Sequence, residues 1–424
     1  MKNSMKHYNL IIVGGGLTGV AAAIAAAREG LEVLIIEKSG FLGGSATNCL
    51  VNPFMKYSIT VRKNGKEELQ RLNTGVFSQI LDRLLETDGL HKNNRTFNEE
   101  NMKLILDRLC KENGVDVLFH CTFTDVQREN NRIVSIEAYL KGGKSDFFAD
   151  YYIDCSGDAE LCAIAGCPYE LGRPEDNLCQ PMTLCFRLAN VDEAKFDENR
   201  SKINPLYNEF QKAGKIKNPR ENVLIFSHFS GGVLHFNTTR VIRLNPTDSF
   251  DLSIAEQEAR EQMFEMHKFL KDNIEGFENS TILMSAPEIG VRESRKVVGE
   301  YVINADDLLS CKKFDDSIAA GAYKVDIHNP DGSGTVLKNI PEGEYYTIPY
   351  RSLIPVGMKN LLVAGRCISS THEAQSAYRV MPIVCNIGEG AGTAISVAYK
   401  SNKSVKDVDI DCVHKLMDKN GVSY

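Results

Sequence analysis

A glycine-rich hexapeptide, followed about twenty positions later by an acidic residue, has the residue types and spacing to bind a nucleotide. The hexapeptide, Gly14-Gly-Gly-Leu-Thr-Gly19, fits G-x-G-x-x-G, and the acid is Glu37. The first glycine permits a tight turn, the second lets a pyrophosphate approach the backbone, and the third lets a helix pack closely on a strand. The carboxylate can accept hydrogen bonds from an adenosine ribose. We expect an ADP-containing dinucleotide to contact Gly14, Gly16, Leu17, Thr18, Gly19 and Glu37.

A strand, a helix and a second strand must hold these residues. Residues 9–13 form an apolar run typical of a buried parallel strand, residues 20–29 an alanine-rich helix, and residues 31–36 the next strand. The helix would direct its N-terminal amides and positive dipole end at the phosphates. A lone G-x-G-x-x-G is a weak signal, but these elements in this order make it strong. The acid favours FAD or NAD over NADP.

Three arginines and a histidine are the candidates for contact with a substrate. Arg292, Arg295 and Arg379 each offer a planar guanidinium that can bind a carboxylate through two hydrogen bonds. His372 could transfer a proton or bind a substrate carbonyl. The alternative is a structural role: His372 could bond only the backbone, and the arginines could form ion pairs. The acids that could pair with Arg292 and Arg295 are Glu288, Glu293 and Glu300.

The twelve cysteines do not follow the pattern of a metal site or a disulfide framework. No Cys-x-x-Cys occurs, and neither Cys162/Cys167 nor Cys179/Cys185 has the spacing of an ordinary zinc knuckle or ferredoxin cluster. We expect no metal, and free thiols that pack as small apolar side chains in a reducing cytosol. Cys49 could lie near a cofactor, but a structural thiol is favoured because no cysteine lies within a few positions of it.

The charge composition and one uncharged segment bear on which partners the protein binds and where it is located. The 424 residues carry 49 basic and 56 acidic side chains, well interspersed, with a net charge of −7. This balance argues against nucleic acid or an anionic membrane as a partner. Residues 10–27 carry no charge and could be taken for a leader or a membrane span, but their glycines cluster at the start and a second strand follows. We expect them to belong to the fold, and the protein to be cytoplasmic.

Several later segments resemble the FAD-binding domain of glutathione-reductase-like flavoproteins. Residues 38–47 resemble the segment that passes beside the ribityl and phosphate of FAD, and residues 122–126 the strand whose backbone meets adenine. Residues 151–158 and 360–366 resemble the strands that return the chain to the FAD domain and bring a glycine to the cofactor. The resemblance implies further cofactor contacts at Lys38, Gly43, Gly44, Ser45, Thr47, Val126, Gly157, Asp158, Gly365 and Arg366.

The likeness is most specific toward the C-terminus. Residues 364–374 read A-G-R-C-I-S-S-T-H-E-A, residues 379–382 R-V-M-P, and residues 388–394 G-E-G-A-G-T-A. With residues 288–295, they are similar to the signature of a bacterial FAD-dependent oxidoreductase family, which is distantly similar to fumarate reductase and succinate dehydrogenase flavoproteins. The resemblance implies an enzyme with FAD as its cofactor. Because the loop after Glu37 has no histidine, we expect non-covalent FAD.

A helix from Pro382 could also reach the flavin. Proline suits a first turn, where its missing N–H is not needed. Gly388, Gly390 and Gly392 remove side chains near the beginning of this helix, and a bare helix start can approach a flat ring. Pro382, Gly388 and Gly392 are therefore candidate flavin contacts. The alternative role of the glycines is close packing against another element.

We predict an α/β fold, in which a Rossmann-like FAD-binding domain of the glutathione-reductase type contains an inserted α+β substrate or cap domain. Residues 1–165 and 345–424 would form the first domain, and residues 166–344 the second. Residues 98–113 predict a helix, and the alternating residues 180–188 and 232–243 an antiparallel sheet. Ser253-Ile-Ala-Glu256 predicts a helix that begins with a capping box. No second G-x-G-x-x-G occurs, which argues against a built-in NAD(P)H domain.

The function that we expect is transfer of hydride or electrons between FAD and a small, anionic organic substrate, because arginines suit a carboxylate. The electron donor or acceptor, and any homo-oligomer, are left open. Proteins of the Rab escort and GDP-dissociation-inhibitor type, which share this fold but bind a protein partner without flavin, are one alternative. An NAD-binding dehydrogenase or NAD sensor is another, but it would not need residues 360–394.

Heating the purified protein should release FAD, because the N-terminal ADP site is coupled to a second, distant segment of the flavoprotein type. Chromatography of the released cofactor checks this. Release of FMN, or no flavin after reconstitution with excess FAD, would contradict it.

Overall fold

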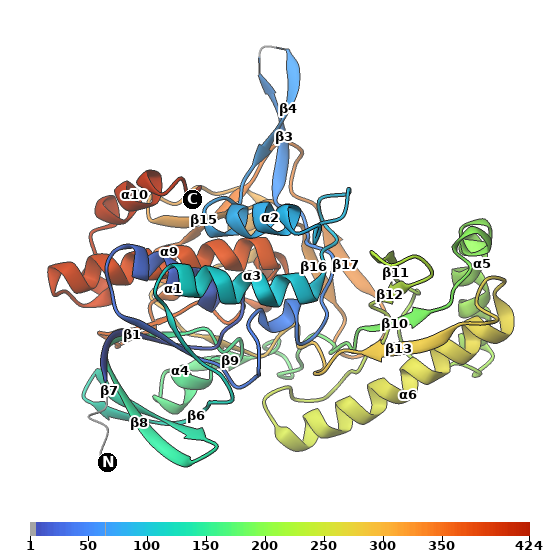
Figure 1. Cartoon of the computed structure of the whole chain (residues 1–424), viewed down its shortest axis with the longest axis horizontal. Helices are drawn as coiled ribbons and strands as arrows, with labels where there is room; N and C mark the ends of the chain where they lie inside the picture. The colour runs from blue at the N-terminus through green and yellow to red at the C-terminus, as the bar shows by residue number, and fades with distance from the viewer. Residues whose placement is uncertain (1–5, 64) are drawn as a thin grey trace.

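A mixed sheet forms the centre of the larger part of the molecule in the computed structural model, which describes residues 6–63 and 65–424 (Figure 1). Its parallel strands lie in the order β5 (Asp116–Leu118), β2 (Val33–Ile36), β1 (His7–Val13) and β8 (Gly143–Asp154), and β19 (Leu361–Val363) also pairs with β8. β2 and β19 are entirely buried, as expected of parallel strands that are covered on both faces. The predicted parallel strands are confirmed.

The parallel strands end level with one another. Val13 pairs with both Ile36 and Asp154, and Val363 pairs with Asp154. The residues that follow therefore meet at one edge of the sheet, where open α/β sheets bind their ligands. These residues are Gly14, Glu37, Cys155 and Ala364.

The first part of β8 belongs to an antiparallel extension with β7 (Arg132–Leu140) and β6 (Thr122–Glu129). The chain enters β6 from the edge where β2 ends, because the Cys121 amide donates to the Glu37 carbonyl at 3.0 Å. The extension thus returns the chain from the ligand edge to the centre of the sheet.

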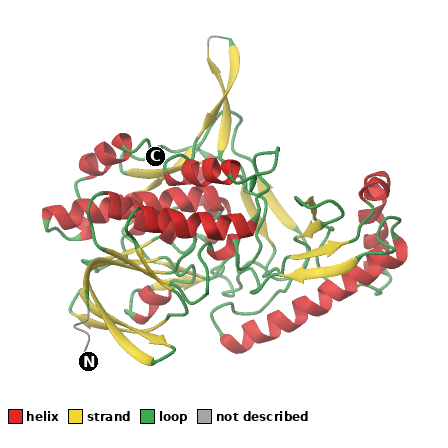
Figure 2. Cartoon of the chain, in the orientation of Figure 1, coloured by secondary structure: helices red, strands yellow, loops and turns green. Residues whose placement is uncertain are grey.

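A layer of helices lies on one side of this sheet (Figures 1 and 2). It contains α1 (Leu17–Arg28), α2 (Val76–Glu86), α3 (Glu99–Glu112), α9 (Met381–Ser401) and α10 (Ile410–Lys419). The helix predicted over 98–113 is confirmed as α3, whose first turn is capped by the Asn98 side chain. The helix predicted from Pro382 is confirmed as α9, with the proline in its first turn.

The glycines of α9 permit close packing. A Cβ at Gly388 would lie 2.1 Å from the carbonyl oxygen of Thr18, and one at Gly392 would lie 2.1 Å from that of Ala22. A Cβ at Gly390 would lie 2.7 Å from Ile318. The bare faces of Gly388 and Gly392 are turned to α1, so the packing role is confirmed. The expected flavin contact of these glycines stays a prediction.

A second, elongated lobe lies beside the larger part (Figure 1). Its antiparallel sheet has the order β11 (Ile225–Ser227), β12 (Leu234–Phe236), β10 (Phe186–Ala189) and β13 (Thr281–Ser285). Helices α5 (Glu193–Lys212) and α6 (Ser249–Asn273) complete the lobe. The antiparallel sheet predicted in this region is confirmed, with shorter strands. The predicted capping box at Ser253 is wrong, because the Asp248 side chain caps α6 and the Ser253 hydroxyl donates to the Ser249 carbonyl.

The two parts have separate apolar cores. The core of the lobe takes its buried residues from positions 186–277, whereas the main core includes Val297, Ile318, Tyr346 and other residues up to the C-terminal helices. The separate core of the lobe is thus shorter than the predicted insert of 166–344, and the domain boundaries stay a prediction.

Shorter elements connect the parts. They are α4 (Glu160–Ile164), β9 (Tyr169–Leu171), β14 (Arg295–Val297), α7 (Ala305–Leu309), β15 (Ser317–Gly321), β16 (Val325–His328), β17 (Thr335–Lys338), β18 (Tyr346–Pro349) and α8 (His372–Tyr378). The predicted turn at 329–334 joins β16 to β17. The hairpin of β3 (Ser58–Lys63) and β4 (Lys66–Arg71) projects from the molecule (Figure 2).

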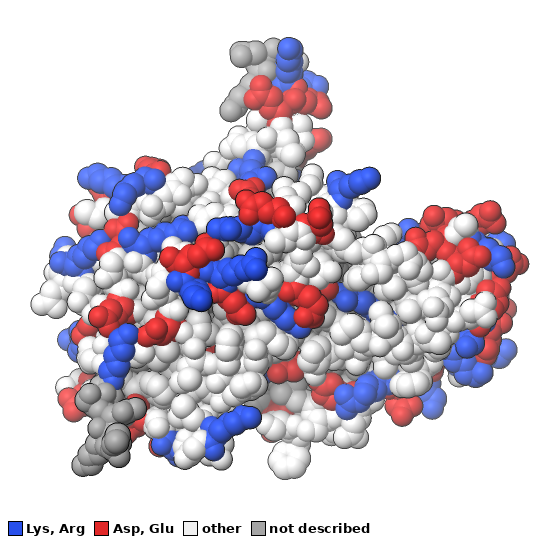
Figure 3. Space-filling model, viewed as in Figure 1, with Lys and Arg blue, Asp and Glu red and all other residues white. Residues whose placement is uncertain are grey.

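Charged side chains of both signs are interspersed over the face shown in Figure 3. Within the part of the chain that the structure describes, no single helix is long and apolar enough to cross a membrane. Only α8 and α9, bent by 95°, pass such a test together, and they do so by length and composition alone.

Gly388→Ala and Gly392→Ala should each lower the free energy of unfolding by about 1–3 kcal/mol, the usual cost of overpacking a core. Urea denaturation measures the change. Gly142→Ala is the control, because its Cβ would meet nothing within 4 Å. Equal stability of the α9 variants and this control would show that α1 and α9 do not pack as closely as described.

Candidate cofactor and substrate site

Bare backbone lines the edge where the parallel strands end. Gly14 has φ +104°, and a Cβ there would lie 2.4 Å from the carbonyl oxygen of Cys155. The Gly43 amide donates to the Gly15 carbonyl at 2.9 Å, and a Cβ at Gly44 would lie 3.0 Å from the Cα of Gly16. The two glycine segments predicted to hold phosphates therefore lie against each other.

The first turn of α1 starts from this bare backbone. Its N-cap is Gly16, which provides no side-chain cap, and the turn contains no acidic residue. A Cβ at Gly19 would lie 2.0 Å from the Gly14 carbonyl oxygen, so this helix requires glycine there. Gly365 lies at the same place, since its Cβ would be 3.3 Å from the Thr18 hydroxyl. Uncapped amides at a positive dipole end suit the pyrophosphate of FAD.

Glu37 is buried at the end of β2 and ordered by two backbone amides. One carboxylate oxygen accepts from the Gly15 amide at 2.7 Å, and the other from the Ser39 amide at 2.8 Å. Each oxygen keeps a further lone pair for a ribose hydroxyl. The same side chain thus braces the glycine turn and could hold the ribose.

The remaining residues of the 38–47 segment take different positions. Lys38 is exposed and forms an ion pair with Glu288 at 3.2 Å, which joins the segment to the chain that leads from the second lobe. The Thr47 hydroxyl donates to the Leu42 carbonyl at 2.8 Å and closes the loop from within. Ser45 is half-buried in the short 3-10 turn Gly44–Ala46.

Val126 lies within β6, where it pairs with Ile136. The residues that the structure brings to the Glu37 turn are instead His120 and Cys121, whose amides donate to the carbonyls of Ser39 and Glu37. The expected contact of Val126 with adenine stays a prediction, and His120 and Cys121 are further candidates because they lie beside the Glu37 turn. Alternation within the strand could not have pointed to them, because they precede it.

Gly157, Asp158, Arg295 and Arg366 form one group. Arg366 donates to the Asp158 carboxylate at 2.7 Å, and a Cβ at Gly157 would lie 2.9 Å from its guanidinium carbon. Arg295 donates to the Asp158 carbonyl at 3.1 Å and lies over the ring of Tyr169. Arg295 therefore bonds the 157–158 loop and none of the three glutamates proposed as its partners.

His372 is buried at the start of α8 and is bound to a glutamate. Its Nδ1 lies 2.8 Å from the Glu293 carboxylate, which also accepts from Lys296 at 2.9 Å and from the Gln180 amide at 3.0 Å. Burial alone would raise the pKa of Glu293, but the bond to His372 and the charge of Lys296 outweigh it and lower the pKa. Glu293 is therefore an anion that orients the imidazole through Nδ1. The second ring nitrogen, Nε2, takes no part in this bond.

Within the part of the chain that the structure describes, Arg292 has only neutral hydrogen-bond partners. Its guanidinium donates to the Pro181 carbonyl at 2.6 Å, the Thr183 hydroxyl at 2.5 Å and the Asn237 side chain at 3.3 Å. Burial, followed by the positive charges of Arg220 and Arg379, lowers its pKa to about 9. The structural alternative for Arg292, an ion pair with Glu288, Glu293 or Glu300, is therefore not found among the described residues.

Arg379 ends α8, and its Nε is buried without a hydrogen-bond partner among the described residues. Arg220, Arg240 and His328 join Arg292 and Arg379 in this region, and sequence reasoning missed all three. They come from loops and a hairpin with no motif, so no local pattern could have identified them.

Cys49 lies near this region, with its Sγ 3.7 Å from the Ile289 carbonyl oxygen. Burial raises its pKa to about 12, so the thiol stays protonated near neutral pH. This environment favours the structural role over a redox role. All twelve cysteines are free, and ten of them are buried.

The comparisons with known proteins cover the chain unequally. A sequence model described as "FAD dependent oxidoreductase" matches residues 9–417. A dihydrolipoamide dehydrogenase of Chaetomium thermophilum is 52% identical over 40 residues, which are 9% of this chain and 8% of that protein. A soluble pyridine nucleotide transhydrogenase of Mycobacterium tuberculosis is 28% identical over 159 residues, 36% of this chain and 31% of that protein. The chain thus matches less than a third of the length of either relative.

Solved structures are similar over nearly the whole chain, at low identity. A p-nitrophenol 4-monooxygenase of Pseudomonas putida has a TM-score of 0.47 at 10% identity and covers 98% of this chain and 84% of its own. A geranylgeranyl bacteriochlorophyll reductase-like protein of Thermoplasma acidophilum has a TM-score of 0.45 at 13% identity, with coverage of 99% and 85%.

Glu37→Ala should weaken FAD binding by about 1–3 kcal/mol, the scale of hydrogen bonds to a charged group. Calorimetric titration of the apoprotein with FAD measures the loss. Glu32→Ala, which removes an exposed carboxylate just before the same strand, is the matched control. An unchanged affinity of the Glu37 variant would assign the ribose to another residue.

Proposed function

Because the chain belongs to the FAD dependent oxidoreductase family, we propose that it holds FAD non-covalently and exchanges electrons with a small anionic organic substrate beside His372 and Arg292. The observation that carries this proposal is the convergence of a glutamate-bound histidine and an arginine without a carboxylate partner. Both lie where α8 meets the segment that leads from the second lobe.

The ligand edge has the features that FAD requires. The uncapped start of α1 and the glycines at 14–16 and 43–44 would receive the pyrophosphate, and Glu37 the ribose. The Arg366 Nε is buried and without a partner among the described residues, so this side chain can also bind the cofactor. When bound, FAD supplies hydride or electron transfer, and the protein binds, orients and moves protons.

His372 would move the proton that accompanies the electron transfer. The anionic Glu293 accepts from Nδ1–H, which in neutral imidazole leaves the lone pair on Nε2. Lys296 offsets the charge of Glu293, and donates to the Gly172 carbonyl at 2.7 Å. This fixed tautomer can take a proton at Nε2 or, once protonated, return it.

Arg292 would hold the substrate anion. Its neutral partners orient the guanidinium without cancelling its charge. Gln375 ties this arginine to α8, because its side-chain amide donates to the Arg292 carbonyl at 2.9 Å. The proton-transfer residue and the anion-binding residue are therefore held in one network.

His372→Asn should slow reduction or reoxidation of bound FAD by about 10²–10⁴-fold, the usual contribution of a positioned acid or base. Glu293→Gln should slow it less, because the imidazole remains. Stopped-flow absorbance with a panel of small carboxylic acids, oxidised and reduced, measures the rates.

The control is His267→Asn, which removes a histidine of α6 that bonds Ser280. All variants should keep the flavin spectrum. If neutral alcohols or amines react with the flavin and no carboxylate does, the anionic-substrate proposal is wrong.

A further inference from the structure

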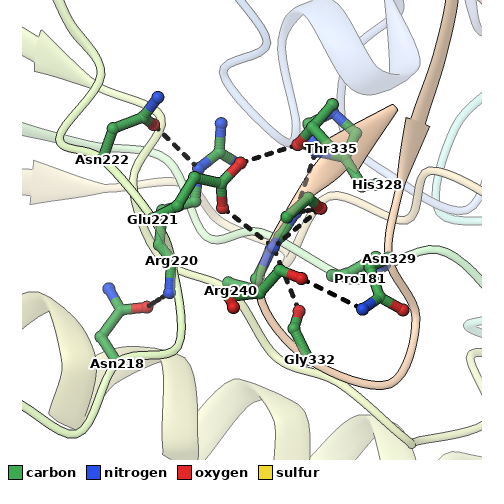
Figure 4. Close-up of polar contacts among 12 residues, drawn as sticks. Pro181, Asn218, Arg220, Glu221, Asn222, Arg240, His328, Asn329, Gly332 and Thr335 are labelled. Atoms are coloured by element: carbon green, nitrogen blue, oxygen red, sulfur yellow. Dashed lines mark hydrogen bonds and ion pairs between the residues drawn. The ribbon is translucent and has the colours of Figure 1, made fainter. Parts of the chain in front are cut away.

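Three arginines of the substrate region have no acidic partner. Arg220, Arg292 and Arg379 form no ion pair within 4.0 Å with any acid of residues 6–63 and 65–424. Their neighbour Arg240 is different, since it pairs with Glu221 at 3.0 Å and donates to the Gly332 carbonyl at 3.1 Å (Figure 4).

Hydrogen bonds and the path of the chain bring these arginines to one region, where the charges of Arg220 and Arg379 act on Arg292. Gln375 joins Arg292 to α8, which Arg379 ends four residues later. The Gln375 side chain also accepts from Gln180 at 3.2 Å, and Gln180 accepts from the His328 amide at 3.4 Å. Strand β16 and helix α8 therefore meet here the segments that enter and leave the second lobe.

Arg220 enters the same place from the loop between α5 and β11. It is only 3% exposed, its Nε donates to Asn222 at 3.4 Å, and its Nη1 has no hydrogen-bond partner among the described residues. Asn218 fixes this loop by donating to the Thr238 carbonyl at 3.2 Å, next to the Asn237 side chain that binds Arg292. A buried guanidinium thus keeps an unused donor in this region.

The two acids near these arginines, Glu221 and Asp326, already bond other side chains. Glu221 pairs with Arg240 and accepts from the Thr335 hydroxyl at 2.7 Å (Figure 4). Asp326 accepts from the Tyr323 hydroxyl at 2.7 Å and lies 3.6 Å from the His328 Nε2. Burial, with the charges of the arginines, holds the pKa of His328 well below its usual value, so its ring is neutral. Four arginines therefore face two carboxylates, and two positive charges are uncompensated.

We infer that Arg220, Arg292 and Arg379 bind a small organic dianion, and that Arg220 selects for the second negative charge. The inference rests on the proposed function, because it assigns the substrate class of the same site. Buried guanidinium groups without counter-charges are unfavourable, and a ligand with two negative charges removes the imbalance that one carboxylate would leave. Two carboxylates or one phosphate ester carry the required charge.

The test is binding to the FAD-loaded full chain. Calorimetry and flavin difference spectra would compare succinate and glycerol 2-phosphate with butyrate. At least one dianion should bind about 10-fold or more tightly than butyrate, and Arg220→Gln should remove that advantage, as expected for the loss of one charge-assisted contact. Arg220→Lys should recover part of it. Whether succinate or the phosphate ester binds more tightly identifies the anionic group.

The matched control is Arg243→Gln, which removes an exposed arginine of the same lobe that pairs with Asp331. Equal affinity for butyrate and both dianions overturns the inference, and so does an equal effect of Arg220→Gln and Arg243→Gln. If Arg220→Gln does not fold by circular dichroism, the comparison of ligands on the unaltered protein decides.

Different results would contradict the proposed function and the inference of a dianion. Arg220-dependent binding of a dianion by a protein whose FAD no small anion can reduce or reoxidise would contradict the proposed function alone. Flavin turnover with a monoanion and no preference for dianions would contradict this inference alone.

Discussion

The close approach of α1 to β1 is the constraint on which the rest of the structure depends. Gly19 lies against the Gly14 carbonyl, so the first turn of the helix sits directly over the strand end. On its other side the same helix receives α9 through Gly388 and Gly392. A side chain at any of these positions would move the uncapped amides away from the edge where the parallel strands end. The packing of the helices and the position of the uncapped amides are thus set by the same missing Cβ atoms.

Near His372 and Arg292, the charge of Glu293 holds separate segments together, as close packing of glycines does at the edge where the parallel strands end. It is buried, follows Arg292 directly, and bonds His372 of α8, Lys296 of β14 and the Gln180 amide. A buried carboxylate is tolerated because it has both cationic and hydrogen-bond partners. It joins segments from distant parts of the chain, so the position of the histidine depends on how the segments on either side of the second lobe pack against α8.

The charge distribution would allow an acidic protein to bind the proposed anion. The whole chain carries −7, yet the region around Arg220, Arg292 and Arg379 has more positive than negative charge. Neutral groups, such as the Pro181 carbonyl and the Asn237 amide, hold the guanidinium of Arg292 in place. The low polarity of a buried site strengthens the attraction for an anion far beyond that of a surface arginine.

The sequence by itself determined the cofactor half, because its signals are local. The glycines from Gly14 to Gly19, the apolar strands and Glu37 follow from backbone needs that act over a few residues. Only the tertiary structure decided the rest. It turned Gly388 and Gly392 toward α1, put His120 and Cys121 beside the Glu37 turn, and gave Arg292 neutral partners in place of the glutamates that were its structural alternative. It also placed Arg220 near Arg292, because the position of a loop residue is decided only when separate elements pack together.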